Sequence, residues 1–116
     1  MGNETTIVKE ILLGIGQTWP DRIRVWRNNT GALKDEHGRL IRFGLNGSAD
    51  ISGIISPRGV RLEIEVKTET GRPSKQQLAF GDMILAHGGW WILARSWAEV
   101  KEVLTDLLKD MDHGRA

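Results

Sequence analysis

The sequence predicts an α/β fold in which a central mixed β-sheet is flanked by helices. Apolar residues recur every three to four positions in some segments and alternate with polar residues in others, giving the order helix, three or four strands, helix, strand, helix. A length of 116 residues is that of one domain. Because 40% of the residues are hydrophobic and 27% are charged, we expect residues 1–116 to form a single globular domain.

The first part of the chain predicts a helix followed by a strand. Apolar residues three and four positions apart predict a helix over residues 4–14, with Asn3 as its cap and with Gly14 and Gly16 closing the segment. Over residues 22–29, Ile and Val alternate with Arg, which is typical of a strand.

The middle of the chain predicts short strands separated by turns. Residues 30–39 contain Gly and Asp and predict a loop, and strands are expected at 40–43 and 49–55 on either side of the turn-forming sequence LNGS. Over residues 60–67 apolar and charged residues alternate strictly, so the segments 49–55 and 60–67 predict an antiparallel hairpin. One face of its second strand carries ionisable residues alone: Arg61, Glu63, Glu65 and Lys67.

The last part predicts a helix over 74–89, a buried strand over 90–95 and a final helix. Ser74 is the expected cap of the first of these helices, and Gly88-Gly89 its end. Ser96 and Glu99 have the spacing of a capping box at the start of the last helix.

The residue types exclude several kinds of site. The chain has no cysteine, which excludes a disulfide scaffold, a thiolate zinc site and a cysteine nucleophile. Its three histidines are scattered, so a histidine-rich metal site is not expected. No apolar run approaches roughly 18 residues and no signal-peptide pattern opens the chain, so we expect a cytoplasmic protein of a bacterial or phage-infected cell, with no membrane partner.

The net charge of +1 hides an uneven distribution. Residues 22–75 carry eleven bases and six acids, whereas both flanking segments are acidic. Ten of the sixteen bases are arginine, the side chain best suited to bidentate phosphate contact. A basic middle indicates a surface for a polyanion, although charges that are simply solvated give the same pattern.

The charged face of residues 60–67 allows two interpretations. On an exposed sheet face, Glu63 and Glu65 would be flanked by Arg61 and Lys67 as ordinary partners. However, the predicted hairpin brings Asp50 beside Glu65, and two carboxylates next to a lysine form a site for a hard divalent cation.

Four segments carry a more specific pattern: WRNNTGA (26–32), RFGLNGSADISGII (42–55), LEIEVKTETGRPSKQQLAF (62–80) and GGWWILARS (88–96). G-S-A-D is followed, fifteen residues after its Asp, by the Glu of E-V-K and then by G-R-x-S-x-x-Q. In this series the chain resembles the VRR-NUC branch of the PD-(D/E)xK nucleases, of the small stand-alone type common in phages and bacteria. The resemblance implies a restriction-endonuclease-like core, αβββαβ plus a C-terminal helix.

The resemblance also implies site residues and a cofactor. Asp50 and Glu65 match the metal-binding carboxylates, the backbone carbonyl of Val66 matches a third metal ligand, and Lys67 matches the catalytic lysine. Gln77 matches a glutamine that helps to order the site. The implied cofactor is Mg²⁺ or Mn²⁺.

Two of the implied roles have alternatives. Gln77 stands three residues after Ser74 and therefore also completes a capping box, which is compatible with a role in the site. An acidic residue in the first helix usually completes the set. Glu4 is the closest match and our prediction, although an acid is also favoured there by the helix dipole, and Glu10 of the same helix competes with it.

The contacts to DNA are expected to come mainly from arginines. Trp26 stands among arginines, where its ring could stack on a base, but we expect it to pack in the core. The candidate phosphate contacts are Arg24, Arg27, Asn29, Arg42, Arg72 and Lys75.

The resemblance therefore predicts a metal-dependent DNA endonuclease. Similar small proteins look like Holliday-junction resolvases, so we expect a homodimer that cuts branched DNA, with residues 90–94 or the last helix at the contact. The alternatives are a monomeric nuclease acting on flaps or ends and a DNA-binding module without activity. A purely structural interaction domain is a weaker third.

Overall fold

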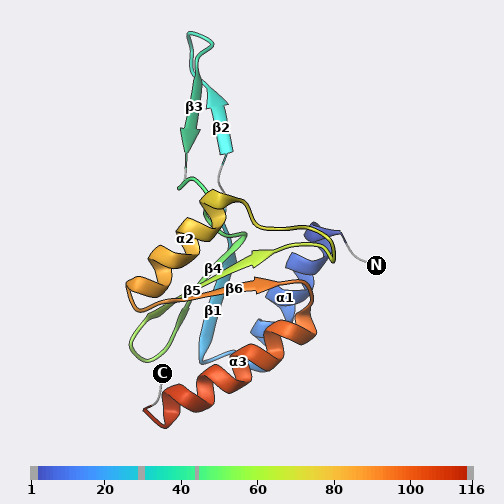
Figure 1. Cartoon of the computed structure of the whole chain (residues 1–116), viewed down its shortest axis with the longest axis vertical. Helices are drawn as coiled ribbons and strands as arrows, with labels where there is room; N and C mark the ends of the chain where they lie inside the picture. The colour runs from blue at the N-terminus through green and yellow to red at the C-terminus, as the bar shows by residue number, and fades with distance from the viewer. Residues whose placement is uncertain (1–2, 29–30, 44, 115–116) are drawn as a thin grey trace.

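The computed structural model describes residues 3–28, 31–43 and 45–114 (Figure 1). Within them the chain is α/β, with a mixed central sheet between helices, as predicted. The elements are α1 (Glu4–Thr18), β1 (Ile23–Arg27), β2 (Gly31–Lys34), β3 (Leu40–Phe43), β4 (Ile51–Ile55), β5 (Val60–Val66), α2 (Lys75–Ala86), β6 (Trp90–Ala94) and α3 (Trp97–Asp112).

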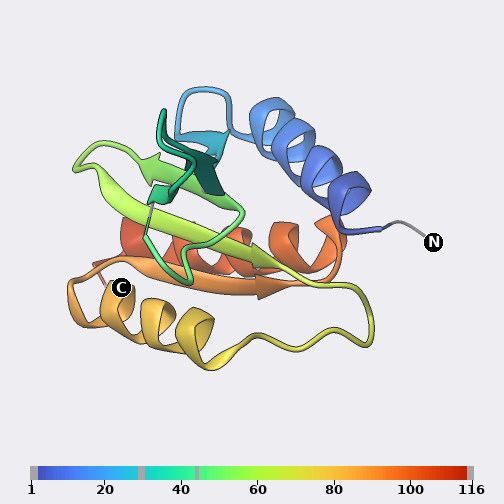
Figure 2. The same ribbon diagram turned by 90° about the horizontal axis from the view of Figure 1, so that it is seen from above.

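The main sheet has the strand order β1-β4-β5-β6. Strands β1, β4 and β5 pair antiparallel, and β5 and β6 pair parallel, so the sheet is mixed. The β4–β5 pairing confirms the predicted hairpin. Helices α1 and α2 lie on opposite sides of the sheet (Figure 2), and α3 packs beside α1.

Strand β5 shows why the sheet needs cover on both faces. Its apolar residues Leu62, Ile64 and Val66 are completely buried in the core that also holds residues of α1 and α3. The intervening residues point to the other face, where α2 packs against β5 and β6. A strand covered on both faces must bury whatever its alternate residues are, and here these include carboxylates.

The sequence predicted that the first helix would close at Gly14 and Gly16, but helix α1 continues to Thr18. A Cβ atom at Gly14 would lie 2.4 Å from the ring of Trp97. Gly14 therefore allows α3 to pack closely against α1, and it does not mark the end of the helix. Trp97 also meets Trp19 edge to face, with ring centroids 6.2 Å apart.

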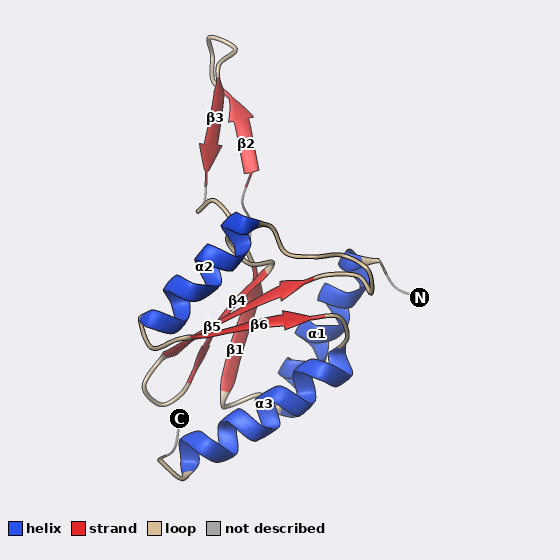
Figure 3. Cartoon of the chain, viewed as in Figure 1, coloured by secondary structure: helices blue, strands red, loops and turns tan. Residues whose placement is uncertain are grey.

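The prediction of a loop over 30–39 was wrong in part, because β2 and β3 form an antiparallel hairpin of their own. Asp35 makes its turn by accepting hydrogen bonds from the backbone N–H groups of His37 and Arg39. This second hairpin projects from the rest of the molecule (Figure 3). Its pairing was missed because the turn residues hid a strand of only four residues.

The other helices begin where the sequence predicts and differ in detail. Ser74 and Gln77 form a complete capping box at the start of α2. In α3, Ser96 accepts from the N–H of Glu99, but the Glu99 carboxylate accepts from the N–H of Arg95 instead of closing the box. None of the helices in the described ranges has an apolar stretch that would cross a membrane.

Candidate active site

Asp50 lies where the ends of three strands meet. Ile51 pairs with Ile64, so the register of the β4–β5 hairpin places Asp50 opposite Glu65. The Asp50 carboxylate accepts a hydrogen bond of 2.8 Å from the N–H of Val66. Its backbone carbonyl accepts another of 2.8 Å from the N–H of Asn28, just past β1. The side chain is therefore fixed beside Val66 and Glu65.

A tight turn brings Asp50 close to α2. Gly47 has a φ of +77°, a conformation that favours glycine, and a Cβ atom there would lie 2.4 Å from the carbonyl oxygen of Gln76. Only a residue without a side chain allows this turn to pack on the first turn of the helix. The next residue of that helix is Gln77.

Gln77 performs both functions that the sequence left open. Its Oε1 accepts from the backbone N–H of Ser74 at 2.8 Å, and its own N–H donates to the Ser74 hydroxyl at 3.1 Å. Its Nε2 donates to Oε2 of Glu65 at 3.0 Å. One side chain thus caps the helix and holds a carboxylate of the site.

Glu65 is 2% exposed and is incompletely paired. Its Oε2 contacts Gln77 and lies 3.4 Å from Nζ of Lys67, whereas its Oε1 is buried without a hydrogen-bond partner among the described residues. Burial, and next the negative charge of Asp50, raise the pKa of Glu65 to about 7, while Lys67 opposes the rise. The site is therefore short of positive charge.

Lys67 is held at the end of β5. Its backbone N–H donates to the carbonyl of Ala94 at 3.0 Å, extending the parallel pairing of β5 with β6. A Cβ atom at Gly71 would lie 3.5 Å from two carbons of the Lys67 side chain, so the loop after β5 packs on that side chain. The ammonium, on a side chain 14% exposed, is thereby held beside Glu65.

The oxygen atoms at this point fit a hard divalent cation. Glu65 offers the unpartnered Oε1 and Asp50 offers a second carboxylate. The N–H of Val66 points to Asp50, and the carbonyl of a strand residue leaves the same side of the strand as its N–H, so the Val66 carbonyl also faces Asp50. In the described part of the chain no three His, Cys, Asp or Glu side chains converge as ligands.

The two candidate acids of α1 differ in position. Glu4 is exposed in the first turn of the helix. Glu10 lines a cavity of about 620 Å³ together with Thr68, Thr70 and Arg95. Both acids are exposed, and of the two only Glu10 lines this cavity, to which Thr68, the residue after Lys67, also contributes.

Glu63 lies in the interior of the fold. It is 0% exposed, and its carboxylate accepts from Nε of Arg61 at 2.6 Å and from the Ser52 hydroxyl at 3.0 Å. The interpretation of residues 60–67 as a solvated charged face is therefore wrong for Glu63 and Glu65, because α2 covers them.

Arg95 is a site neighbour that the sequence analysis missed. Its guanidinium donates to the backbone carbonyls of Thr68, Glu69 and Gly71, the last at 2.7 Å. These hydrogen bonds hold the loop between Lys67 and Ser74 against the end of β6. Its position directly after a buried strand was the available signal, but acceptors almost thirty residues away are not visible in the sequence.

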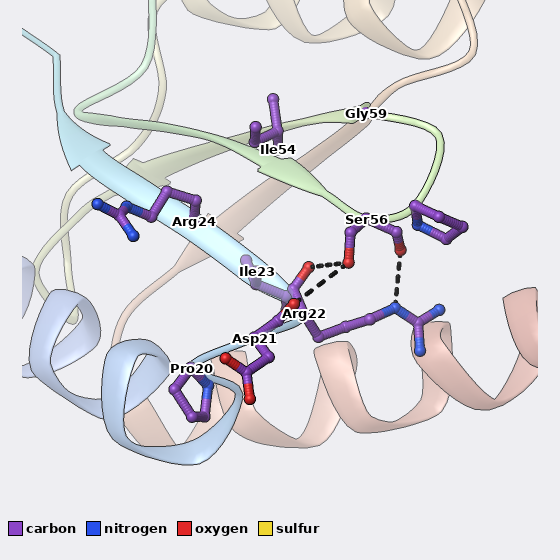
Figure 4. A pocket seen from close by; sticks show the side chains of 9 residues that line it. Pro20, Asp21, Arg22, Ile23, Arg24, Ile54, Ser56 and Gly59 are labelled. Atoms are coloured by element: carbon purple, nitrogen blue, oxygen red, sulfur yellow. Dashed lines mark hydrogen bonds between the residues drawn. The ribbon is translucent and has the colours of Figure 1, made fainter.

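The candidate phosphate contacts are dispersed. Arg24, Arg27, Arg72 and Lys75 are exposed. Asn29 lies outside the described residues, as does the side chain of Arg42. Arg24 lines a cavity of about 420 Å³ at the far end of β1 (Figure 4), where Arg22 is engaged with the Ser56 carbonyl and Asp112.

Comparisons of the chain with protein-family models, with curated proteins and with solved structures found no match. The assignment of a function therefore rests on the residues and their geometry.

Proposed function

We propose that this protein is a metal-dependent endonuclease that hydrolyses DNA phosphodiester bonds, as the resemblance to VRR-NUC nucleases predicts. One observation carries the proposal. Asp50 and Glu65 converge beside Lys67, and Glu65 is buried with one oxygen unpartnered among the described residues and with a raised pKa. Such an arrangement destabilises the ionised protein unless a cation binds there.

The residues fit the Mg²⁺ or Mn²⁺ ion that the resemblance implies. Asp50, Glu65 and the Val66 carbonyl would hold it, since hard oxygen donors suit these metals. The ion would supply charge neutralisation at the scissile phosphate and lower the pKa of a water molecule.

The side chains around this position have separable tasks. Lys67 places a positive charge beside Glu65, where it can also contact a phosphate oxygen as negative charge develops. Gln77 holds Oε2 of Glu65, which leaves Oε1 for the cation. The Val66 N–H holds one oxygen of Asp50 in the same way.

The proposed substrate is branched DNA, and the proposed assembly is a homodimer. The basic middle of the chain favours a polyanionic partner. Among the described residues β6 is an edge strand of the main sheet, which supports the proposal of a contact between two copies through residues 90–94. A solution mass twice the 13.0 kDa of the chain is expected. A mass of one chain would contradict the dimer and favour the flap or end nuclease.

The test is cleavage of a labelled four-way junction, a flap and a linear duplex of matched sequence, in Mg²⁺ or Mn²⁺. Wild type should make paired symmetric cuts in the junction, and Asp50→Asn should make none while still binding DNA. Asp106→Asn, an exposed acid on α3, is the matched control and should cut as wild type does.

Each other outcome has a definite meaning. Cuts confined to flaps or ends would retain the nuclease and exclude the resolvase. Binding without cuts in either metal would leave a DNA-binding module, and no binding to any DNA would exclude both.

A further inference from the structure

The sheet face that carries the site is only partly covered. Helix α2 packs against β5 and β6. On β1 and β4, at the other side of the same face, Trp26 is 43% exposed and Ile54 is 42% exposed. The prediction that Trp26 packs in the core was therefore wrong, and a large aromatic side chain is partly exposed on the sheet face that carries the site.

The strand register relates Trp26 to the site. Trp26 pairs with Ser52, which pairs with Glu63, so these three residues form one row across the sheet. Two residues further along β1, Asn28 donates its N–H to the Asp50 carbonyl. Because alternate residues of a strand share a face and lie about 7 Å apart, Trp26 stands one step from the row of Asp50 and Glu65.

Positive charge lies on the other side of Trp26. The next row consists of Arg24, Ile54 and Arg61, paired in that order across the sheet. Figure 4 shows Arg24 and Ile54 on neighbouring strands. Arg24 is exposed, and the Arg61 side chain is 52% exposed although it pairs with Glu63, which is itself fully buried. The surface beside Trp26 therefore presents guanidinium groups.

We propose that Trp26 is a stacking platform for an unpaired base of the DNA strand that enters the site, with Arg24 and Arg61 contacting phosphates of that strand. An aromatic face beside guanidinium groups is complementary to a base joined to phosphates. Bases inside a duplex have both faces covered by their neighbours, so a single-stranded segment is the form that fits. An apolar protein surface would instead cover the exposed Arg24 without offering its charge a partner.

This inference rests on the proposed function, because it assumes that the bound DNA strand leads into the site. Its test, however, does not require cleavage. Binding is measured by fluorescence anisotropy in EDTA, with a duplex that has a single-stranded tail and with a blunt duplex. Trp26→Ala should weaken binding to the tailed DNA about tenfold or more and leave binding to the blunt duplex unchanged. Trp26→Phe should recover most of the loss, since it keeps an aromatic face.

Controls separate stacking from damage to the fold. Val103→Ala removes an apolar side chain of similar exposure (44%) on α3 and should change neither affinity. Thermal unfolding of each variant verifies that it folds. Equal affinity of wild type and Trp26→Ala for the tailed DNA, or an equal loss for both DNAs, would overturn the platform, as would the absence of any DNA binding.

A second measurement locates the base. With 2-aminopurine placed at successive positions of the tail, one position should change its fluorescence on binding wild type, and Trp26→Ala should abolish that change. If this holds while no substrate is cut in either metal, the platform stands and the nuclease does not. If cleavage occurs and no position responds to Trp26, the nuclease stands and the platform does not.

Discussion

Glu63 and Glu65 leave the same face of β5 two residues apart, and both are buried, but their surroundings differ. The Glu63 carboxylate accepts from Arg61 and Ser52, one partner for each oxygen. Glu65 has Gln77 and Lys67 at one oxygen, and its other oxygen has no partner among the described residues. Asp50 faces Glu65, with its negative charge raising the pKa of that group.

The difference distinguishes a structural carboxylate from an available one. A buried charge with full hydrogen bonding is tolerated in a folded domain, whereas an unpartnered oxygen costs free energy unless a ligand satisfies it. Glu63 therefore belongs to the stability of the sheet. Glu65 belongs to the candidate site. Four changes to the chain or its conditions test this division between a structural carboxylate and a site carboxylate.

The largest expected effect is on cleavage. Glu65→Gln should reduce the rate about 100-fold or more, because it removes a charged ligand of the proposed cation. Glu63→Gln, two residues away on the same face, should retain most of the activity of its folded fraction. The measurement is the single-turnover cleavage rate on the preferred DNA. Equal losses in the two variants would show that the division is wrong.

The next effect is on stability at Glu63. Arg61→Ala leaves the Glu63 carboxylate buried with the Ser52 hydroxyl alone, so the free energy of unfolding should fall by about 3 kcal/mol. Urea unfolding followed by tryptophan fluorescence measures this. Arg58→Ala, in the exposed turn between β4 and β5, is the control and should change little. A loss no larger than that of the control would mean that Glu63 does not depend on Arg61.

The third effect is the pH dependence of stability without metal. The unfolded chain releases the Glu65 proton near pH 4.5, and the folded protein holds it to about pH 7. Between these values the folded protein binds more proton, so its stability should fall with rising pH by about 2–3 kcal/mol relative to Glu65→Gln.

Unfolding in EDTA across this range measures that difference, which should level off above about pH 7. Adding Mn²⁺ above that pH should stabilise wild type more than Glu65→Gln. Parallel curves for the two proteins would indicate that Glu65 has its ordinary pKa.

The smallest effect separates capping from catalysis. Ser74→Ala and Ser96→Ala each remove a helix cap and should each cost about 1 kcal/mol of stability. Only Ser74→Ala also loosens Gln77, and with it Glu65, so it alone should lower the cleavage rate at a temperature where both variants are folded. Equal cleavage rates for the two variants would show that Gln77 acts only as a helix cap.

Local sequence patterns predicted most of the elements, because caps and alternation act over a few residues. The Ser74–Gln77 box begins α2 where its spacing indicated, and the alternation over residues 60–67 forms β5. The patterns failed where a distant residue decides. Gly14 looked like a helix end because its neighbour Trp97 is far away in the chain. Trp26 looked like a core residue because the extent of α2 over the sheet was not visible.

The site divides in the same way. The predicted hairpin placed Asp50 beside Glu65, and strand alternation put Lys67 on the same face, because both patterns act over short range. Gln77 was expected near them only from the resemblance, since its capping box fixes its position on α2 and not the packing of α2 on β5. Tertiary structure alone decided which carboxylate is satisfied, because Arg61 and Ser52 reach Glu63 while Oε1 of Glu65 remains unpartnered among the described residues. The difference between the two carboxylates depends on burial by α2 and on contacts across strands, and these exist only when the chain is folded.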